Sequence, residues 1–99
     1  MSLYYDKEGN PIDLNKWVNL FENMDYKIIK QETLENGVFV STVWLGLDHS
    51  FREGGKPIIF ETMAFPSDNL DTHNDMKRYY TLEEALEGHK AMVKKWKGE

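Results

Sequence analysis

Apolar residues recur at two different spacings along the chain, and the change of spacing separates helices from strands. From residue 14 to residue 23 they lie three or four positions apart, which predicts an amphipathic helix with Asp13 as its N-cap. The same spacing over residues 82–95 predicts a second helix, preceded by the capping box Thr81-Leu82-Glu83-Glu84. Gly88 lies inside this helix, where glycine usually indicates close packing against a neighbouring element.

Three segments rich in β-branched and aromatic residues predict antiparallel strands at residues 26–35, 38–47 and 57–65. Asn36-Gly37 separates the first two and is a strong signal for a two-residue hairpin loop. Such a loop pairs Glu35 with Val38 and thereby fixes the register of the hairpin. The face that includes this pair also includes four residues farther along the strands: Ile29, Val40, Thr42 and Trp44.

The expected fold is therefore α+β: a three-stranded antiparallel β-meander with an N-terminal and a C-terminal helix. Short edge strands are expected near Tyr4-Tyr5, after the Gly9 turn, and as a brief extended piece at residues 78–80. We expect one domain over residues 4–97, because 99 residues is close to the commonest domain size. Residues 1–3 have the character of an expression leader.

Composition narrows the classes of function. The formal net charge of −5 argues against a general nucleic-acid binder, because affinity for phosphate comes from clustered Lys and Arg. The absence of cysteine excludes disulfides and zinc–thiolate sites and agrees with a reducing compartment. No apolar run approaches the roughly 18 residues of a membrane span, so we expect a soluble cytoplasmic protein without a membrane partner. Four lysines near the C-terminus are expected to stabilise the last helix through its dipole: Lys90, Lys94, Lys95 and Lys97.

A metal or hydrolase site would use Asp48 and His49 after the second strand, Glu61 in the third, and His73 in the acidic loop. Glu61 is expected opposite Val43 or Trp44, which separates it from Asp48 by about 13–16 Å at the rise of a β-strand. Direct ligands of one metal ion cannot lie that far apart. His49 and His73 can still meet if the loop after the third strand folds back.

These residues also have structural interpretations. Asp48 is expected to accept backbone N–H groups, and His89 to be a hydrogen-bonded histidine of the core or its boundary. A buried Glu61 needs a partner, and the sequence leaves Lys30, Arg52, Arg78 and a tyrosine hydroxyl as candidates. No phosphate-binding loop, zinc-protease motif or EF-hand spacing is present, so no cofactor is indicated.

The hairpin face with Ile29, Val40, Thr42 and Trp44 has a larger apolar area than a protein surface in contact with water usually has. Either one helix covers each face of the sheet, or a second subunit or another protein covers Trp44 and its neighbours. Aromatic residues such as Trp44 often anchor interfaces.

Four segments resemble those of a family of small uncharacterised proteins encoded in bacteriophage and prophage genomes. They are Tyr5-Asp6 with Gly9-Asn10-Pro11-Ile12, Ser41-Thr42-Val43-Trp44-Leu45-Gly46-Leu47-Asp48-His49, Pro57-Ile58-Ile59-Phe60-Glu61-Thr62-Met63, and Tyr80-Thr81 followed by Glu84-Ala85 and Gly88-His89. The resemblance covers nearly the whole chain. It implies a phage origin and action in the host cytoplasm, and it assigns no catalytic residue. The Phe51-Arg52-Glu53 loop is more charged than the glycine-rich loop of the family.

The leading hypothesis is a non-enzymatic phage accessory protein that binds a host or phage protein, or a second copy of itself. Its interface would consist of Trp44, Thr42, Val40 and Ile29. The alternative is a small hydrolase or metal-dependent enzyme that uses Asp48, His49, Glu61 and His73. A third hypothesis, an acidic mimic of nucleic acid, agrees poorly with the mixed distribution of Lys and Asp.

Overall fold

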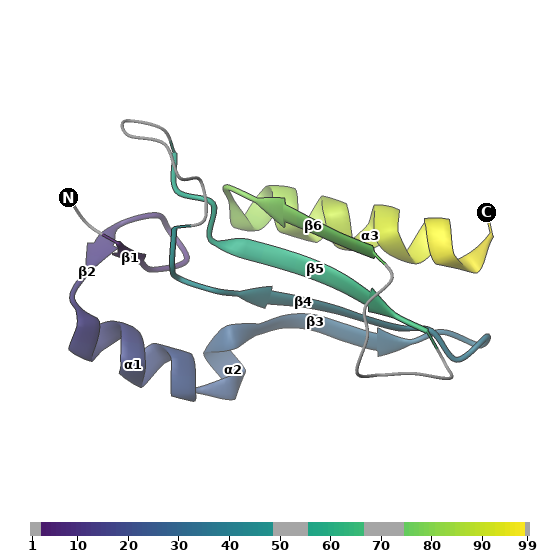
Figure 1. Ribbon diagram of the computed structural model, residues 1–99, viewed down its shortest axis with the longest axis horizontal. Helices are drawn as coiled ribbons and strands as arrows, with labels where there is room; N and C mark the ends of the chain where they lie inside the picture. The colour runs from purple at the N-terminus through teal and green to yellow at the C-terminus, as the bar shows by residue number, and fades with distance from the viewer. Residues whose placement is uncertain (1–2, 49–55, 67–74, 99) are drawn as a thin grey trace.

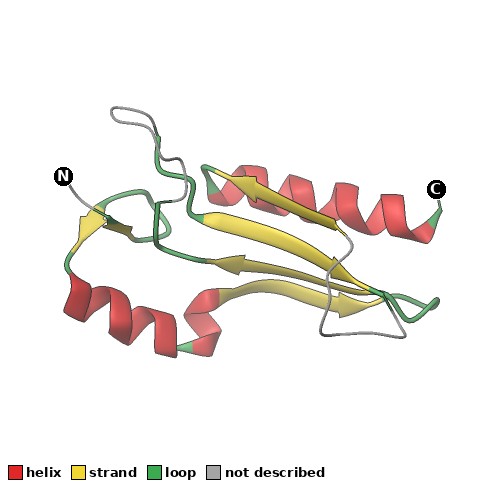
Figure 2. Ribbon diagram, in the orientation of Figure 1, coloured by secondary structure: helices red, strands yellow, loops and turns green. Residues whose placement is uncertain are grey.

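The computed structural model describes residues 3–48, 56–66 and 75–98, and their fold is α+β (Figures 1 and 2). A four-stranded antiparallel sheet has the order β3-β4-β5-β6, and β1 and β2 form a separate two-stranded sheet. The elements, in chain order, are β1 (Tyr4–Tyr5), β2 (Pro11–Ile12), α1 (Leu14–Glu22), α2 (Met24–Lys27), β3 (Ile28–Thr33), β4 (Phe39–Trp44), β5 (Phe60–Phe65), β6 (Asp75–Tyr79) and α3 (Leu82–Lys97).

Helix α3 packs on one face of the four-stranded sheet and runs along the strands (Figure 1). Helices α1 and α2 and the β1–β2 sheet gather at one end of the molecule, beside the start of β3 (Figure 2). The two ends of the chain lie at opposite ends of the longest dimension, which is 42 Å (Figure 1). The C-terminal part of α3 therefore lies far from α1 and close to the β3–β4 hairpin.

The α+β class and both predicted helices are confirmed, and the sheet differs from the expectation at two places. The extended piece expected at residues 78–80 is a full fourth strand, β6, paired with β5. The start of the first predicted strand is instead the short helix α2. Asn23 explains this difference, because its side-chain oxygen accepts hydrogen bonds from the backbone N–H groups of Asp25 and Tyr26 and so caps a helical turn.

The predicted two-residue loop between β3 and β4 is wrong by one residue. Gly37 N–H donates to the carbonyl of Leu34 at 2.9 Å, and Leu34 N–H donates to the carbonyl of Val38 at 2.8 Å. The loop therefore has three residues, Glu35 to Gly37, and Gly37 adopts φ +88°. Glu32 consequently pairs with Val40 and Lys30 with Thr42. This shift places Glu32 and Lys30 on the sheet face that α3 covers.

The core lies between that face and α3. Val40 belongs to a buried cluster that includes Met92 of α3, and Trp44 belongs to a second buried cluster with Phe60 and Tyr79. The ring of Trp44 meets Tyr26 edge-on at 4.9 Å, and its Nε1–H donates to the Tyr5 carbonyl at 3.1 Å.

The hairpin face expected to form an open interface is therefore closed within the chain. Val40, Thr42 and Trp44 each have 0% exposure, and Ile29 is half-buried against the cluster that contains Trp44. Helix α3 covers the middle of β4, and residues of β1, α1 and α2 surround Trp44. The expectation that these four residues form an accessible binding surface is wrong for this structure.

The close packing predicted at Gly88 is confirmed, since a Cβ atom there would overlap the hydroxyl and ring of Tyr79. Gly88→Ala is expected to lower the free energy of unfolding by about 1–3 kcal/mol despite the higher helix propensity of alanine. Urea denaturation measures the loss. The same change in a Tyr79→Leu background is expected to cost less, because the hydroxyl and the ring that the Cβ atom would overlap are both absent. Equal costs in the two backgrounds would contradict the overlap with Tyr79 as the cause.

Candidate functional site

A chain of hydrogen bonds joins four polar side chains beneath α3. Thr62 and Thr42 hydroxyls lie 2.5 Å apart, Thr42 Oγ1 lies 2.6 Å from His89 Nδ1, and His89 Nε2 lies 2.8 Å from Glu32 Oε2. The two threonines are fully buried, and His89 is 1% exposed. A carboxylate only accepts hydrogen bonds, so Nε2 donates to Glu32; in the neutral ring Nδ1 then accepts from Thr42. The prediction that His89 is a hydrogen-bonded core residue is confirmed.

The order hydroxyl, imidazole, carboxylate matches the side chains of a nucleophilic triad. The arrangement of Thr42 nevertheless opposes that function, because its hydroxyl has no exposure and already contacts Thr62 and His89. A substrate carbonyl cannot reach it without displacing α3. We therefore interpret the chain of hydrogen bonds as a structural link between β5, β4, α3 and β3.

Tyr79 extends the polar interior beyond Thr62. Its hydroxyl is buried and lacks a hydrogen-bond partner among the described residues. Burial raises the pKa of Tyr79. The hydroxyl lies against Gly88, so its position is set by the packing of β6 on α3.

A groove of about 380 Å³ opens between β3 and the C-terminal half of α3. We call it the lysine groove, and the residues that line it are Lys30, Glu32, His89, Lys90, Val93, Lys94 and Lys97. Lys90, Lys94 and Lys97 are four and three positions apart, so they form one stripe about 10 Å long on α3. The opposite wall is β3, with Lys30 and Glu32 two positions apart on one face.

Positive charge in the lysine groove is only partly compensated. The Glu32 carboxylate lies 2.8 Å from His89 and 3.8 Å from Lys30, and Lys90 lies 3.5 Å from Glu87 outside the groove. Lys94 and Lys97 form no ion pair with any described residue. The adjacent Lys95 differs, because it pairs with Asp75 and lowers the pKa of that carboxyl. Two lysines of the groove are thus free to bind an anion.

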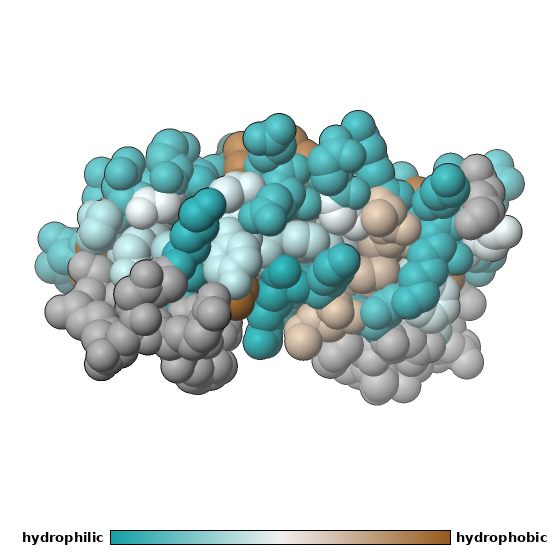
Figure 3. All heavy atoms as spheres, turned by 90° about the horizontal axis from the view of Figure 1, so that it is seen from above, coloured by the Kyte–Doolittle hydropathy of each residue, from teal (hydrophilic) through white to brown (hydrophobic). Residues whose placement is uncertain are grey.

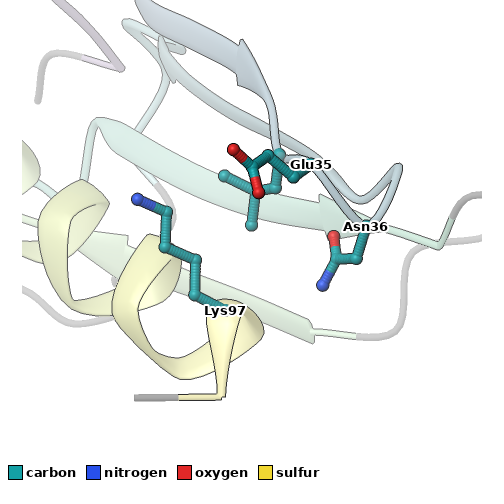
Figure 4. Close-up of a pocket in the computed structure, with 4 residues that line it drawn as sticks. Glu35, Asn36 and Lys97 are labelled. Carbon is teal, nitrogen blue, oxygen red and sulfur yellow. The ribbon is translucent and has the colours of Figure 1, made fainter.

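A second hollow, of about 390 Å³, continues from the lysine groove at the hairpin end. Figure 4 shows Lys97 extending from α3 toward Glu35, with Asn36 between the hairpin and the helix end. Asn36 Nδ2 donates to the carbonyl of Trp96 at 2.8 Å, which ties the hairpin to the last turn of α3. This contact holds the two walls of the groove together at one end.

Two of the four residues predicted for a metal or hydrolase site, Glu61 and Asp48, lie in the described part of the chain and have separate structural contacts. Glu61 is buried opposite Val43, as expected, and accepts a hydrogen bond from Arg78 Nε at 2.9 Å. Asp48 Oδ1 accepts from the backbone N–H of Ile58 at 3.0 Å. His49 and His73 lie outside the described residues. Within the described residues, no group of three or more histidine and carboxylate side chains could hold a metal ion.

Hydrophilic side chains cover most of the surface seen from above, and apolar ones form only small separate areas on it (Figure 3). Among the described residues, no helix is both long enough and apolar enough to traverse a lipid bilayer. A ligand on this side of the protein would therefore contact mainly charged and polar side chains.

Comparison with known proteins gives no relative: no protein-family model, curated protein or solved structure matches the chain significantly. The lysine groove was missed by sequence reasoning, which assigned its lysines to the helix dipole alone. The available signal was the spacing of Lys90, Lys94 and Lys97, which separates them from Lys95 on the helix surface.

Proposed function

We propose that this protein is a non-enzymatic binding module that recognises an acidic segment of a partner protein through the lysine groove. The observation that carries the proposal is the gathering of four lysines around one groove in a chain whose net charge is −5. Lys94 and Lys97 lack counter-charges among the described residues, and an acidic partner supplies them.

The resemblance of the Ser41–His49 and Pro57–Met63 segments to small phage and prophage proteins supports a proposal about the origin of the protein and its place of action. On that basis the protein is a phage accessory protein, it acts in the cytoplasm of the host bacterium, and its partner is a host or phage protein. A hydrolase at Asp48, His49, Glu61 and His73 has less support, because Glu61 is occupied by Arg78.

The test is the binding of a fluorescein-labelled deca-glutamate peptide, followed by fluorescence anisotropy at low salt. Lys94→Gln/Lys97→Gln is expected to weaken binding about tenfold, since two exposed ion pairs of about 0.7 kcal/mol each are lost. Binding of the wild-type protein is expected to weaken as salt is added.

The matched control is Lys16→Gln/Lys77→Gln, which removes the same charge from exposed sites on α1 and β6. Its affinity is expected to stay close to that of the wild type. An equal loss in both double variants would contradict the proposal, because the peptide would then sense only the net charge.

A further inference from the structure

We infer that the acidic partner binds in an extended conformation, as an additional strand along the free edge of β3. This inference rests on the proposed function and specifies the conformation of the ligand. β3 is the first strand in the order β3-β4-β5-β6, and no other described strand pairs with its outer edge. Backbone groups along an edge of this kind can pair with an added strand.

The hydrogen-bond pattern of the hairpin identifies the backbone groups that point outward. Leu34 N–H donates to Val38, so this pair is a hydrogen-bonded pair of the ladder. Hydrogen-bonded and non-hydrogen-bonded pairs alternate in antiparallel strands. In the observed register the N–H and carbonyl groups of Gln31 and Thr33 therefore point away from β4. Both residues are exposed.

The lysine stripe of α3 is placed to contact such a strand. Helix α3 packs mainly over β4 and β5, so the groove beside it lies above β3. A strand added about 4.8 Å beyond β3 would project every second side chain toward α3, with a repeat of about 6.8 Å. Lys90 and Lys94 are separated by about 6 Å along the helix. Carboxylates at alternate positions of the strand therefore match the lysine spacing.

Two features of β3 restrict pairing to acidic strands. Lys30 lies on the strand itself, and the register shifts at a bulge between Ile28 and Lys30. Charged side chains and bulges are the usual protection of an edge against unselective pairing. An acidic strand supplies counter-charges for Lys94 and Lys97, which form no ion pair with a described residue, whereas a neutral or basic strand supplies none. Nucleic acid fits less well, because the described residues that line the groove include no Phe, Tyr or Trp on which bases could stack.

The experiment compares two peptides of equal composition, one with five alternating Glu-Thr pairs and one with five glutamates followed by five threonines. The alternating peptide is expected to bind at least about fivefold more tightly. At ten times its Kd it is expected to slow amide exchange of Gln31 and Thr33 about tenfold, as measured by NMR. Gln31→Pro, which removes one outward N–H, is expected to weaken binding relative to Gln31→Ala.

The outcomes separate this inference from the proposed function. Equal affinities, with no slowing of exchange at Gln31 and Thr33, would overturn strand addition and leave an acidic-segment binder. Failure of both peptides to bind would overturn both proposals. Tighter binding of a deoxythymidine ten-mer than of either peptide would overturn the acidic-polypeptide class of partner. If Gln31→Pro does not fold, amide exchange of the wild-type protein with bound peptide decides whether the peptide adds as a strand.

Discussion

Trp44→Ala is expected to lower the free energy of unfolding by about 3–5 kcal/mol, a large share of the stability of a domain of this size. Trp44 has 0% exposure and packs against Tyr26 and Phe21. The substitution leaves a cavity and removes the donor to the Tyr5 carbonyl. Urea denaturation followed by circular dichroism measures the loss, and light scattering gives the mass of the folded variant.

The control is Leu14→Ala, which removes an apolar side chain that is 52% exposed on α1. It is expected to change stability by no more than about 0.5 kcal/mol. A Trp44→Ala variant that kept wild-type stability but changed from dimer to monomer would contradict the burial of Trp44. It would restore the interface that the sequence predicted.

The helices were predictable because the signals that define them are local. Asp13 and Thr81 cap their helices as expected, and the backbone N–H groups that donate to them lie three positions along the chain, at Lys16 and Glu84. For the partner of Glu61, the sequence predicted only a set of candidate residues. It contains several cationic side chains and does not specify which strand will lie beside Glu61. The structure selects Arg78 because β6 pairs with β5 in the register that places the two residues opposite each other.

The register of the hairpin was not predictable from Asn36-Gly37 alone. The same pair of residues suits a two-residue loop and also the end of a three-residue loop in which only Gly37 needs a positive φ. The difference is one residue, but it moves every side chain of one strand relative to the other. In the predicted register Glu32 would lie opposite Ser41 on the other face, away from His89 and the lysine groove.

The lysine groove could be predicted only in part, because it combines a local and a non-local feature. The stripe of Lys90, Lys94 and Lys97 follows from helix geometry. Its position beside the edge strand depends on α3 packing over β4 and β5, which no local pattern specifies. The burial of Val40 and Thr42 has the same non-local origin, because it too depends on α3 packing over β4.

His89→Ala is expected to lower the free energy of unfolding by about 2–4 kcal/mol, through a cavity and the loss of two hydrogen bonds. Thr42 would keep Thr62 but lose His89 as a hydrogen-bond partner inside the core, and the Glu32 carboxylate would lose the His89 donor. Urea denaturation measures the effect. Leu86→Ala, at a position on α3 that is 41% exposed, is the control and is expected to cost much less.

A double-mutant cycle tests whether His89 and Thr42 act as one unit. His89→Leu removes one of the two hydrogen-bond partners of the Thr42 hydroxyl and Thr42→Val leaves His89 Nδ1 without a partner, whereas the double variant replaces both members by apolar side chains. The double variant is therefore expected to cost less than the sum of the single variants, by at least about 1 kcal/mol. Strictly additive costs would contradict the coupling. Because the double variant also removes the Nε2–H donor that holds the Glu32 carboxylate at the floor of the lysine groove, the released carboxylate is expected to weaken binding of the acidic peptide. This effect links the buried network to the recognition surface.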